Sequence, residues 1–223
     1  EQLFLYASIE TDDYEGEASG GMAAYAVDPE TGKLTYINEQ SSGGNYPCHQ
    51  SVDPSGQFLV TANYGGPFVV FPIREDGGLD PVAFVWQNDG AGPHPNQEMS
   101  HPHCALFTPD GRFVATADLG VDAVQIFRLD NDGTLHLESM ALLAEGAGPR
   151  HLVFSPDASV LYVANELNAT VTALAYDPDA GELGEEIRTI SMVPEDFADE
   201  RSAAEIVMHP SGRFLYASNR EIS

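Results

Sequence analysis

Four copies of one short phrase are spaced along this chain, and this repetition constrains the fold more than any other feature of the sequence. The copies are DPSGQFLVTANYG from 53, TPDGRFVATADLG from 108, SPDASVLYVANEL from 155 and HPSGRFLYASNRE from 209. Their prolines lie 55, 47 and 54 residues apart, and a truncated copy, LFLYASIE, occupies 3–10. The chain is therefore predicted to consist of repeated structural units.

Each unit has the pattern of an antiparallel sheet. The turn opens a strand such as RFVATAD, in which apolar residues alternate and β-branched or aromatic side chains are frequent. A second strand such as DAVQIFRL follows, and then a turn rich in Asp, Asn and Gly such as DNDGTL, which suits a tight hairpin. A third strand, a loop rich in Gly and Pro, and a fourth strand lead to the next copy. Four antiparallel strands per unit predict the blades of a β-propeller.

The length of the units sets the number of blades. With 223 residues, the chain holds about four to five blades, so we expect a single partial β-propeller domain over 1–223 that belongs to a larger ring. The first residues, EQLFLYASIE, read as strand, with no basic segment or signal peptide, so the native start is expected to lie upstream. A ring closed by four or five blades is the alternative, and it leaves the first and last strands poorly paired.

The charge excludes several classes of partner. The chain has 35 Asp and Glu against nine Lys and Arg, for a net charge of −26, which argues against nucleic acid and against an anionic membrane surface. No apolar run is long enough to cross a bilayer, so we expect no membrane association. The acidity is typical of a salt-adapted source or simply of an acidic surface, and both readings stay open. Cys48 and Cys104 are too few for a disulfide framework, which favours the cytoplasm.

Alignment of the copies reveals columns of unlike residues. Directly after the strand that each turn opens, the four copies have Tyr64, Leu119, Glu166 and Arg220. Six positions before each turn proline they have Cys48, His103, Arg150 and Ala204, and five before it His49, Cys104, His151 and Glu205. Equivalent positions in a repeat normally hold similar residues, because each unit packs on its neighbours in the same way. Since such strand ends surround one mouth of a propeller channel, four of these residues are predicted to converge: His103, Arg150, Glu166 and Arg220.

Four segments carry a resemblance to a known family. They are VDPSGQFLVTANYGG, HPHCALFTPDGRFVATADLGVDAV, GAGPRHLVFSPDASVLYVANELNATV and AAEIVMHPSGRFLYASNR. The chain resembles, over essentially its whole length, the seven-bladed propeller lactonases, which comprise bacterial 6-phosphogluconolactonases of the propeller type and fungal 3-carboxy-cis,cis-muconate lactonizing enzymes. The resemblance implies seven blades in the full protein. It also implies that His103, Arg150, Glu166 and Arg220 are the active-site residues.

These residue types suit an anionic lactone, and the resemblance implies hydrolysis of an anionic sugar lactone, with 6-phosphogluconolactone as the expected substrate and 6-phosphogluconate as the product. Arg150 and Arg220 can bind a phosphate or carboxylate through paired hydrogen bonds. Glu166 or His103 is expected to activate water, and the other to protonate the leaving alkoxide. A cycloisomerisation of the muconate type can use the same set, so both reactions stay open. Neither needs a metal or a nucleotide, and we expect no cofactor.

Other polar residues have structural alternatives. His101 and His151 are further candidates for substrate binding, although His151, with His49, also fits a hydrogen-bonded channel or core residue. His101 and His103 alternate along the chain, but no third ligand stands at a recognisable spacing, so no metal site is predicted. Cys48 and Cys104 are read as small apolar fillers, and Asn63, Asp118 and Asp122 as strand-end residues that bond nearby backbone. A non-catalytic propeller that binds partners over one face is the rival function, and the oligomeric state is left open.

Overall fold

The computed structural model describes residues 3–197 and 201–220, which fold almost entirely into antiparallel sheets. The first sheet has three strands: β1 (Leu3–Ile9), β2 (Gly21–Val27) and β3 (Leu34–Ser41). The second has four: β4 (Asn45–Val52), β5 (Phe58–Gly65), β6 (Phe68–Pro72) and β7 (Phe84–Trp86). The third has β8 (Pro102–Phe107), β9 (Phe113–Asp118), β10 (Ala123–Leu129) and β11 (Leu135–Leu142). The short 3-10 helix η1 (Leu119–Val121) joins β9 to β10.

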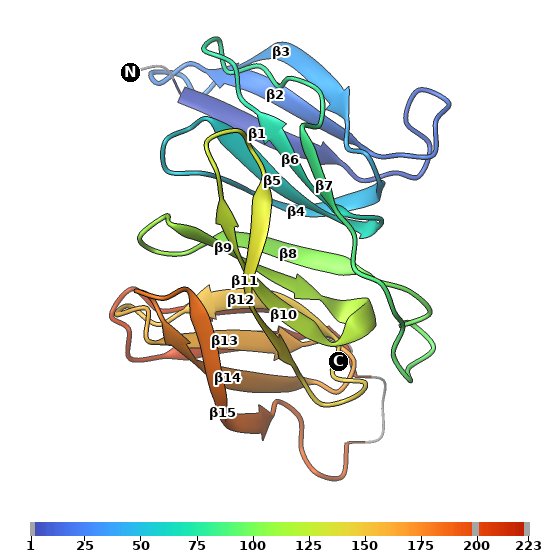
Figure 1. Ribbon diagram of the computed structural model, residues 1–223, viewed down its shortest axis with the longest axis vertical. Coiled ribbons are helices and arrows are strands. Elements are labelled where there is room, and N and C mark those ends of the chain that lie inside the picture. The colour runs from blue at the N-terminus through green and yellow to red at the C-terminus, as the bar shows by residue number, and fades with distance from the viewer. Residues whose placement is uncertain (1–2, 198–200, 221–223) are drawn as a thin grey trace.

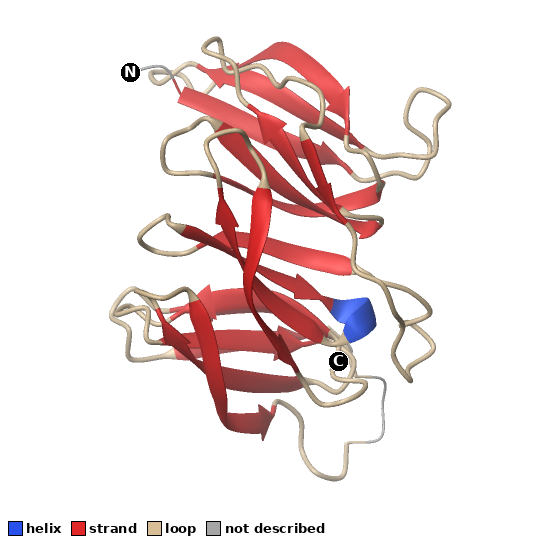
Figure 2. Ribbon diagram, viewed as in Figure 1, coloured by secondary structure: helices blue, strands red, loops and turns tan. Residues whose placement is uncertain are grey.

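The fourth sheet repeats the same order with β12 (Pro149–Phe154), β13 (Val160–Asn165), β14 (Thr170–Asp177) and β15 (Glu182–Ser191). The fifth contains β16 (Ala203–Met208) and β17 (Leu215–Asn219). The sheets follow one another in sequence order down the molecule (Figure 1), and strands dominate the described chain (Figure 2). These sheets confirm the predicted blades, with strands in the predicted order.

The first strand of each blade lies beside the first strand of the next. β4 contacts β8, β8 contacts β12, and β12 contacts β16. In the first sheet, β1 corresponds to β5 of the second sheet. Both strands carry a copy of the repeated phrase, and both are followed by a hairpin of the same kind. The row formed by β4, β8, β12 and β16 brings residues from four sheets together.

Apolar side chains between the sheets form the core. Val60 and Phe68 of the second blade pack with Val114 and Phe127 of the third, and all four are buried. Comparable clusters lie between the first and second, the third and fourth, and the fourth and fifth blades. Each blade is thus stabilised mainly by burying apolar area against its neighbours, as expected for a repeat protein. Among the described residues, no helix is long and apolar enough to span a membrane.

The repeated turn depends on a carboxylate that accepts backbone hydrogen bonds and on a residue with a left-handed backbone conformation, at positive φ. In the second blade, Asp53 Oδ1 accepts hydrogen bonds from the backbone N–H groups of Gln57 and Phe58, both at 2.7 Å. Gly56 has a φ of 73°, which glycine adopts without steric cost. Ala158 has a φ of 55° at the equivalent position of the fourth blade, so the turn conformation is kept even where glycine is absent.

Candidate functional site

The residues predicted from the columns lie at one end of the blades. His103 is on β8, Arg150 is on β12, Glu166 directly follows β13, and Arg220 directly follows β17. Backbone hydrogen bonds fix the last two positions. The Glu166 N–H donates to the carbonyl of Gly148 at 2.7 Å, and the Arg220 N–H donates to Ser202 at 2.9 Å.

A β-bulge marks the same column in three blades. The strand register shifts between Pro47 and His49, between Pro102 and Cys104, and between Pro149 and His151. The residues left without a ladder partner are Cys48, His103 and Arg150. Because a bulge interrupts the regular alternation of a strand, it redirects the side chain that it carries, and bulges often stand next to functional sites. The alignment column that contains Cys48, His103 and Arg150 therefore coincides with a β-bulge that recurs in three blades.

Glu166 joins the two arginines. Its Oε2 lies 2.9 Å from Nε of Arg150, and its Oε1 lies 2.6 Å from Nη2 of Arg220. The Arg150–Glu166 contact is an ion pair without good hydrogen-bond alignment, since Arg150 Nε has no acceptor along its N–H direction. The side chains of Arg150 and Glu166 are mostly buried, at 15% and 16% exposure, whereas that of Arg220 is 47% exposed. The three groups together carry one net positive charge in a strongly acidic chain.

His103 is buried beside this group. Its ring centroid lies 5.4 Å from that of His151 and 5.6 Å from that of Tyr64, both with edge-on geometry. Its Nδ1 lies 3.7 Å from the Cys48 sulfur. Burial, and then the positive charge of Arg150, lower the pKa of His103 well below its ordinary value. His103 is therefore neutral near pH 7.

His101 packs against Tyr64. The two rings stack with centroids 4.4 Å apart, and His101 Nδ1 lies 2.8 Å from the Tyr64 carbonyl oxygen. Its Nε2 is 3.4 Å from a Glu98 carboxylate oxygen. One ring nitrogen is thus taken by the backbone, which explains the position of His101 without a metal. No group of three or more His, Cys, Asp and Glu side chains with the geometry of a metal site occurs among the described residues.

The predicted strand-end residues act as anchors, over a longer range than expected. Asn63 donates to the carbonyl of Pro67, four positions later, but also to that of Ser42, 21 positions earlier, both at 3.0 Å. Asp122 accepts from the N–H groups of Gly146 and Gly148, both at 2.8 Å, which stand 24 and 26 positions later. The reason is that β11 runs back beside β10 and returns the chain to Asp122, so Asp122 holds the segment that leads into Arg150.

Sequence reasoning named Tyr64 and Glu205 as members of the columns but did not select them. Tyr64 contacts both His101 and His103, and Glu205 Oε1 lies 3.0 Å from Nδ1 of His151. The signal for both was present, because each stands in a column that also contains a selected residue. The sequence did not reveal which residue of the neighbouring blade Tyr64 and Glu205 each contact.

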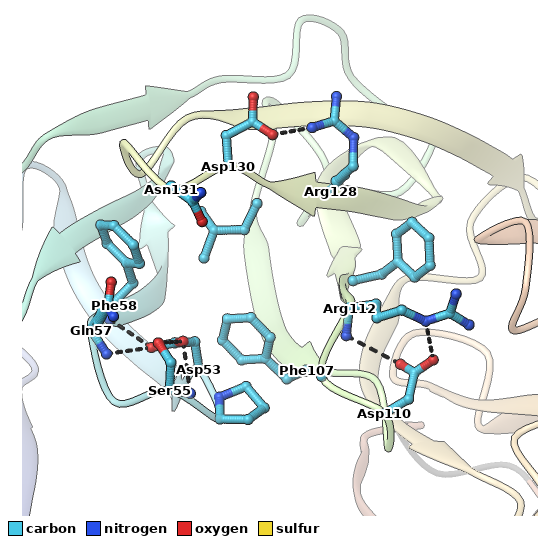
Figure 3. A pocket seen from close by; sticks show the side chains of 14 residues that line it. Asp53, Ser55, Gln57, Phe58, Phe107, Asp110, Arg112, Arg128, Asp130 and Asn131 are labelled. Atoms are coloured by element: carbon cyan, nitrogen blue, oxygen red, sulfur yellow. Dashed lines mark hydrogen bonds and ion pairs between the residues drawn. The ribbon is translucent and has the colours of Figure 1, made fainter.

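A cavity of about 540 Å³ lies at the opposite ends of the strands, around the repeated turns. Figure 3 shows Phe107 between the turn that carries Asp53 and the pair formed by Asp110 and Arg112. Asp110 Oδ2 is 2.6 Å from Arg112 Nε, and Arg128 pairs with Asp130 and with Glu138. The charged side chains around the cavity are already paired with one another, so they leave few free groups to bind a ligand. The candidate site therefore remains the group formed by Arg150, Glu166 and Arg220 at the other end of the blades.

The fold and this group define a segment of a β-propeller with a polar cluster at one mouth. A family model described as Lactonase, 7-bladed beta-propeller matches residues 1–222, and the chain belongs to this family. A 6-phosphogluconolactonase from Bacillus subtilis is 42% identical over 207 residues, covering 92% of this chain and 59% of the relative. A 6-phosphogluconolactonase from Enterobacter is 37% identical over 202 residues, covering 90% and 57%.

The chain is also similar to solved structures. The periplasmic gluconolactonase PpgL of Pseudomonas aeruginosa superposes with a TM-score of 0.90 at 30% identity, covering 97% of this chain and 62% of that one. A protein from Lactobacillus plantarum gives 0.88 at 34% identity, covering 97% and 61%. The chain thus spans less than two thirds of the length of the curated relatives and of these structures.

Proposed function

We propose that the protein containing this chain hydrolyses 6-phosphogluconolactone to 6-phosphogluconate. One observation carries the proposal: Glu166 is paired with Arg150 and Arg220 at the same mouth that holds the neutral His103. Membership of the lactonase family, and relatives named 6-phosphogluconolactonase, support the choice of substrate. Because the chain spans only part of those relatives, the proposal concerns the whole protein.

The two arginines are proposed to bind the phosphate. A guanidinium carries five N–H donors; Arg220 donates one of them to Glu166, whereas Arg150 meets Glu166 in an ion pair through Nε. In the described structure, Nη2 of Arg150 makes no hydrogen bond, and the remaining donors of Arg220 are likewise unused. An anionic substrate is repelled by a chain with a net charge of −26, so a local pair of arginines offsets that repulsion where the substrate binds.

His103 is proposed as the general base. As a neutral imidazole it can take a proton from water while the water oxygen bonds to the lactone carbonyl carbon. The tetrahedral intermediate then expels the ring oxygen, and the His103 imidazolium returns its proton to that alkoxide. The new carboxylic acid loses its proton to solvent, which completes the balance. The buried position of His103 favours the neutral starting state that this sequence requires.

Glu166 is proposed to orient the arginines rather than to accept a proton. Each of its carboxylate oxygens faces a guanidinium, so its negative charge is already stabilised in the resting site. This arrangement suits a residue that holds the two guanidinium groups in position. We therefore propose His103 rather than Glu166 as the base.

The test is hydrolysis of 6-phosphogluconolactone by the full-length protein, measured above the spontaneous rate. We expect activity in the wild type and its loss in His103→Gln, Arg150→Ala and Glu166→Gln. Arg128→Ala is the matched control, because Arg128 is also ion-paired but lies at the opposite end of the blades. A folded wild type that hydrolyses no lactone but cyclises a carboxymuconate would identify a cycloisomerase, and inactivity on both would favour a binding scaffold.

Two further proposals concern the domain organisation and the location of the protein. Residues 1–223 are proposed to belong to one propeller domain, and the protein is proposed to act in the cytoplasm. The two free cysteines support a reducing compartment, although the P. aeruginosa structure is named as periplasmic. Fractionation of cells that express the full-length protein tests the location.

A further inference from the structure

Arg150 is held by a second set of contacts besides Glu166. Its Nη1 donates to the carbonyl oxygen of Ala204 at 2.9 Å and lies 3.3 Å from Nε2 of His151. The other ring nitrogen of His151, Nδ1, lies 3.0 Å from Oε1 of Glu205. A chain of polar contacts thus runs from Glu205 on β16, through the imidazole on β12, to the guanidinium that is proposed to bind the substrate.

The same carboxylate oxygen of Glu205 has a second partner. It accepts a hydrogen bond from the N–H of Ile206 at 2.9 Å, which fixes the position of the oxygen relative to β16. Burial raises the pKa of Glu205, but its hydrogen bonds to His151 and to the Ile206 N–H outweigh this effect and leave the pKa below its ordinary value. Glu205 is therefore an ionised acceptor at neutral pH.

Only one protonation state of His151 satisfies both neighbours. A carboxylate needs a donor, so Nδ1 must carry a proton. A guanidinium N–H needs an acceptor, so Nε2 must carry a lone pair. The imidazolium places an N–H against the Arg150 N–H and adds a positive charge beside it. The Nε2–H tautomer places a lone pair against the carboxylate and an N–H against Arg150, so both contacts become repulsive.

The surroundings of His151 favour the neutral ring. Burial lowers its pKa, the hydrogen bond to Glu205 opposes that shift, and the charge of Arg150 adds to the lowering, so that the pKa stays below its ordinary value. The His49 ring packs edge-on at a centroid distance of 5.3 Å, and the pKa of His49 is itself lowered to about 4. A neutral neighbour adds no charge that would stabilise an imidazolium.

We infer that Glu205 and His151 are positioning residues: Glu205 fixes His151 as the Nδ1–H tautomer, whose Nε2 holds Nη1 of Arg150 in place. With Nε in an ion pair with Glu166, and Nη1 in contact with Ala204 and His151, Nη2 is left for the anion of the substrate. The role of His151 is thus to orient the arginine rather than to bind substrate directly. The catalytic consequence rests on the proposed lactonase function, whereas the tautomer does not.

The tautomer is tested by NMR of the full-length protein labelled with 15N-histidine. Two-bond 1H–15N correlations distinguish the Nδ1–H tautomer, the Nε2–H tautomer and the imidazolium, and the His151 signals are identified by their loss in His151→Gln. We expect a neutral Nδ1–H ring at pH 7 in the wild type. In Glu205→Ala, we expect the Nε2–H form to become populated. A wild-type ring that is cationic or in the Nε2–H form would overturn the inference.

Kinetics test the consequence for Arg150. Loss of an interaction that only holds a binding group is expected to raise KM more than it lowers kcat, so Glu205→Ala should raise KM for 6-phosphogluconolactone about tenfold with kcat changed less than about threefold. Glu205→Gln should be close to wild type, because its amide oxygen can still accept from Nδ1–H. Glu138→Ala, which removes one of the two carboxylate partners of Arg128 at the other end, is the matched control.

The two failures can be told apart. An unchanged KM in Glu205→Ala, with a wild-type enzyme that is active, contradicts the positioning role. An inactive wild type that still shows the Nδ1–H tautomer, lost in Glu205→Ala, contradicts the proposed function and supports the assignment of Glu205 and His151.

Discussion

Nη2 of Arg220 lies 2.6 Å from Oε1 of Glu166, although the two residues are separated by 54 positions in the chain. They occupy the same column of the repeat in successive blades. His151 and Glu205, also 54 positions apart, form a second contact of this kind. Neighbouring blades therefore bring equivalent positions together, and unlike residues in one column become interaction partners. These contacts account for the unlike residues Glu166 and Arg220 in one column, and His151 and Glu205 in the other.

The two arginines that bind Glu166 should respond differently to truncation. Arg220 is 47% exposed, so Arg220→Ala is expected to change the free energy of unfolding by less than about 1 kcal/mol. Arg150→Ala removes the buried one of the two partners of Glu166, so that its mostly buried carboxylate keeps only the half-exposed Arg220, and should cost about 3 kcal/mol. Urea unfolding of the full-length variants measures both values. Equal losses of stability would show that exposure does not govern the strength of these pairs.

Acid sensitivity is expected from His49. Burial, and then the neighbouring His151, lower its pKa to about 4, and its Nδ1 accepts a hydrogen bond from the Ala105 N–H at 3.2 Å. Because the unfolded state takes up a proton near pH 6.5 and the folded state only near pH 4, stability falls as the pH drops between these values, by about 3 kcal/mol in total. Below pH 4 both states are protonated and the loss is complete.

The measurement is the free energy of unfolding at several pH values between 4 and 7, for the wild type and for His49→Gln. The many carboxylates of the chain also contribute to acid sensitivity, but they contribute to both proteins. The difference between the two curves should therefore have a slope of about 1.4 kcal/mol per pH unit within this window. Parallel curves would mean that His49 is not the residue responsible.

The sequence predicted the strands, and it also predicted that Arg150, Glu166 and Arg220 meet, because both features follow from repetition. Alternating apolar residues and the recurrent turn define the strands β5, β9, β13 and β17. The columns identified Arg150 and Glu166 because a mouth position with a charged residue stands out against its counterparts. Nothing beyond the residue types was needed for these predictions.

The contacts within the site could not be predicted in the same way. Cys48 approaches His103, and Cys104 approaches His49, so each pair joins equivalent positions of adjacent blades. Which side chains of a column turn toward each other depends on the bulges that shift the strand register by one residue. A bulge is set by backbone geometry and packing between blades, which a pattern of residue types does not reveal. The same reason explains why Glu205 was not recognised as the partner of His151.

Both cysteine thiols are expected to be unreactive in the folded protein. Burial raises the pKa of Cys48 and of Cys104 to about 12. Since only the thiolate reacts, labelling by a thiol reagent at pH 8 should be slower than that of a free cysteine by about three orders of magnitude. Mass mapping of the labelled peptides before and after unfolding in urea measures this. Rapid labelling of either residue in the native protein would contradict the structure.

Two glycines in the repeated turn offer a test of packing between blades. Gly56 and Gly111 have nearly the same φ, at 73° and 71°, so alanine suffers the same backbone strain at both positions, about 1 kcal/mol. A Cβ added at Gly56 would meet no atom within 4 Å, whereas one at Gly111 would lie 2.2 Å from Cγ of Pro54 in the preceding blade. Gly111→Ala must therefore separate the two turns and should lose about 2 kcal/mol more than Gly56→Ala, by analogy with other overpacked sites. Urea unfolding of the two variants provides the comparison, in which each serves as the control for the other. Equal destabilisation would mean that contact between the turns contributes little and that the blades are held together by their apolar faces alone.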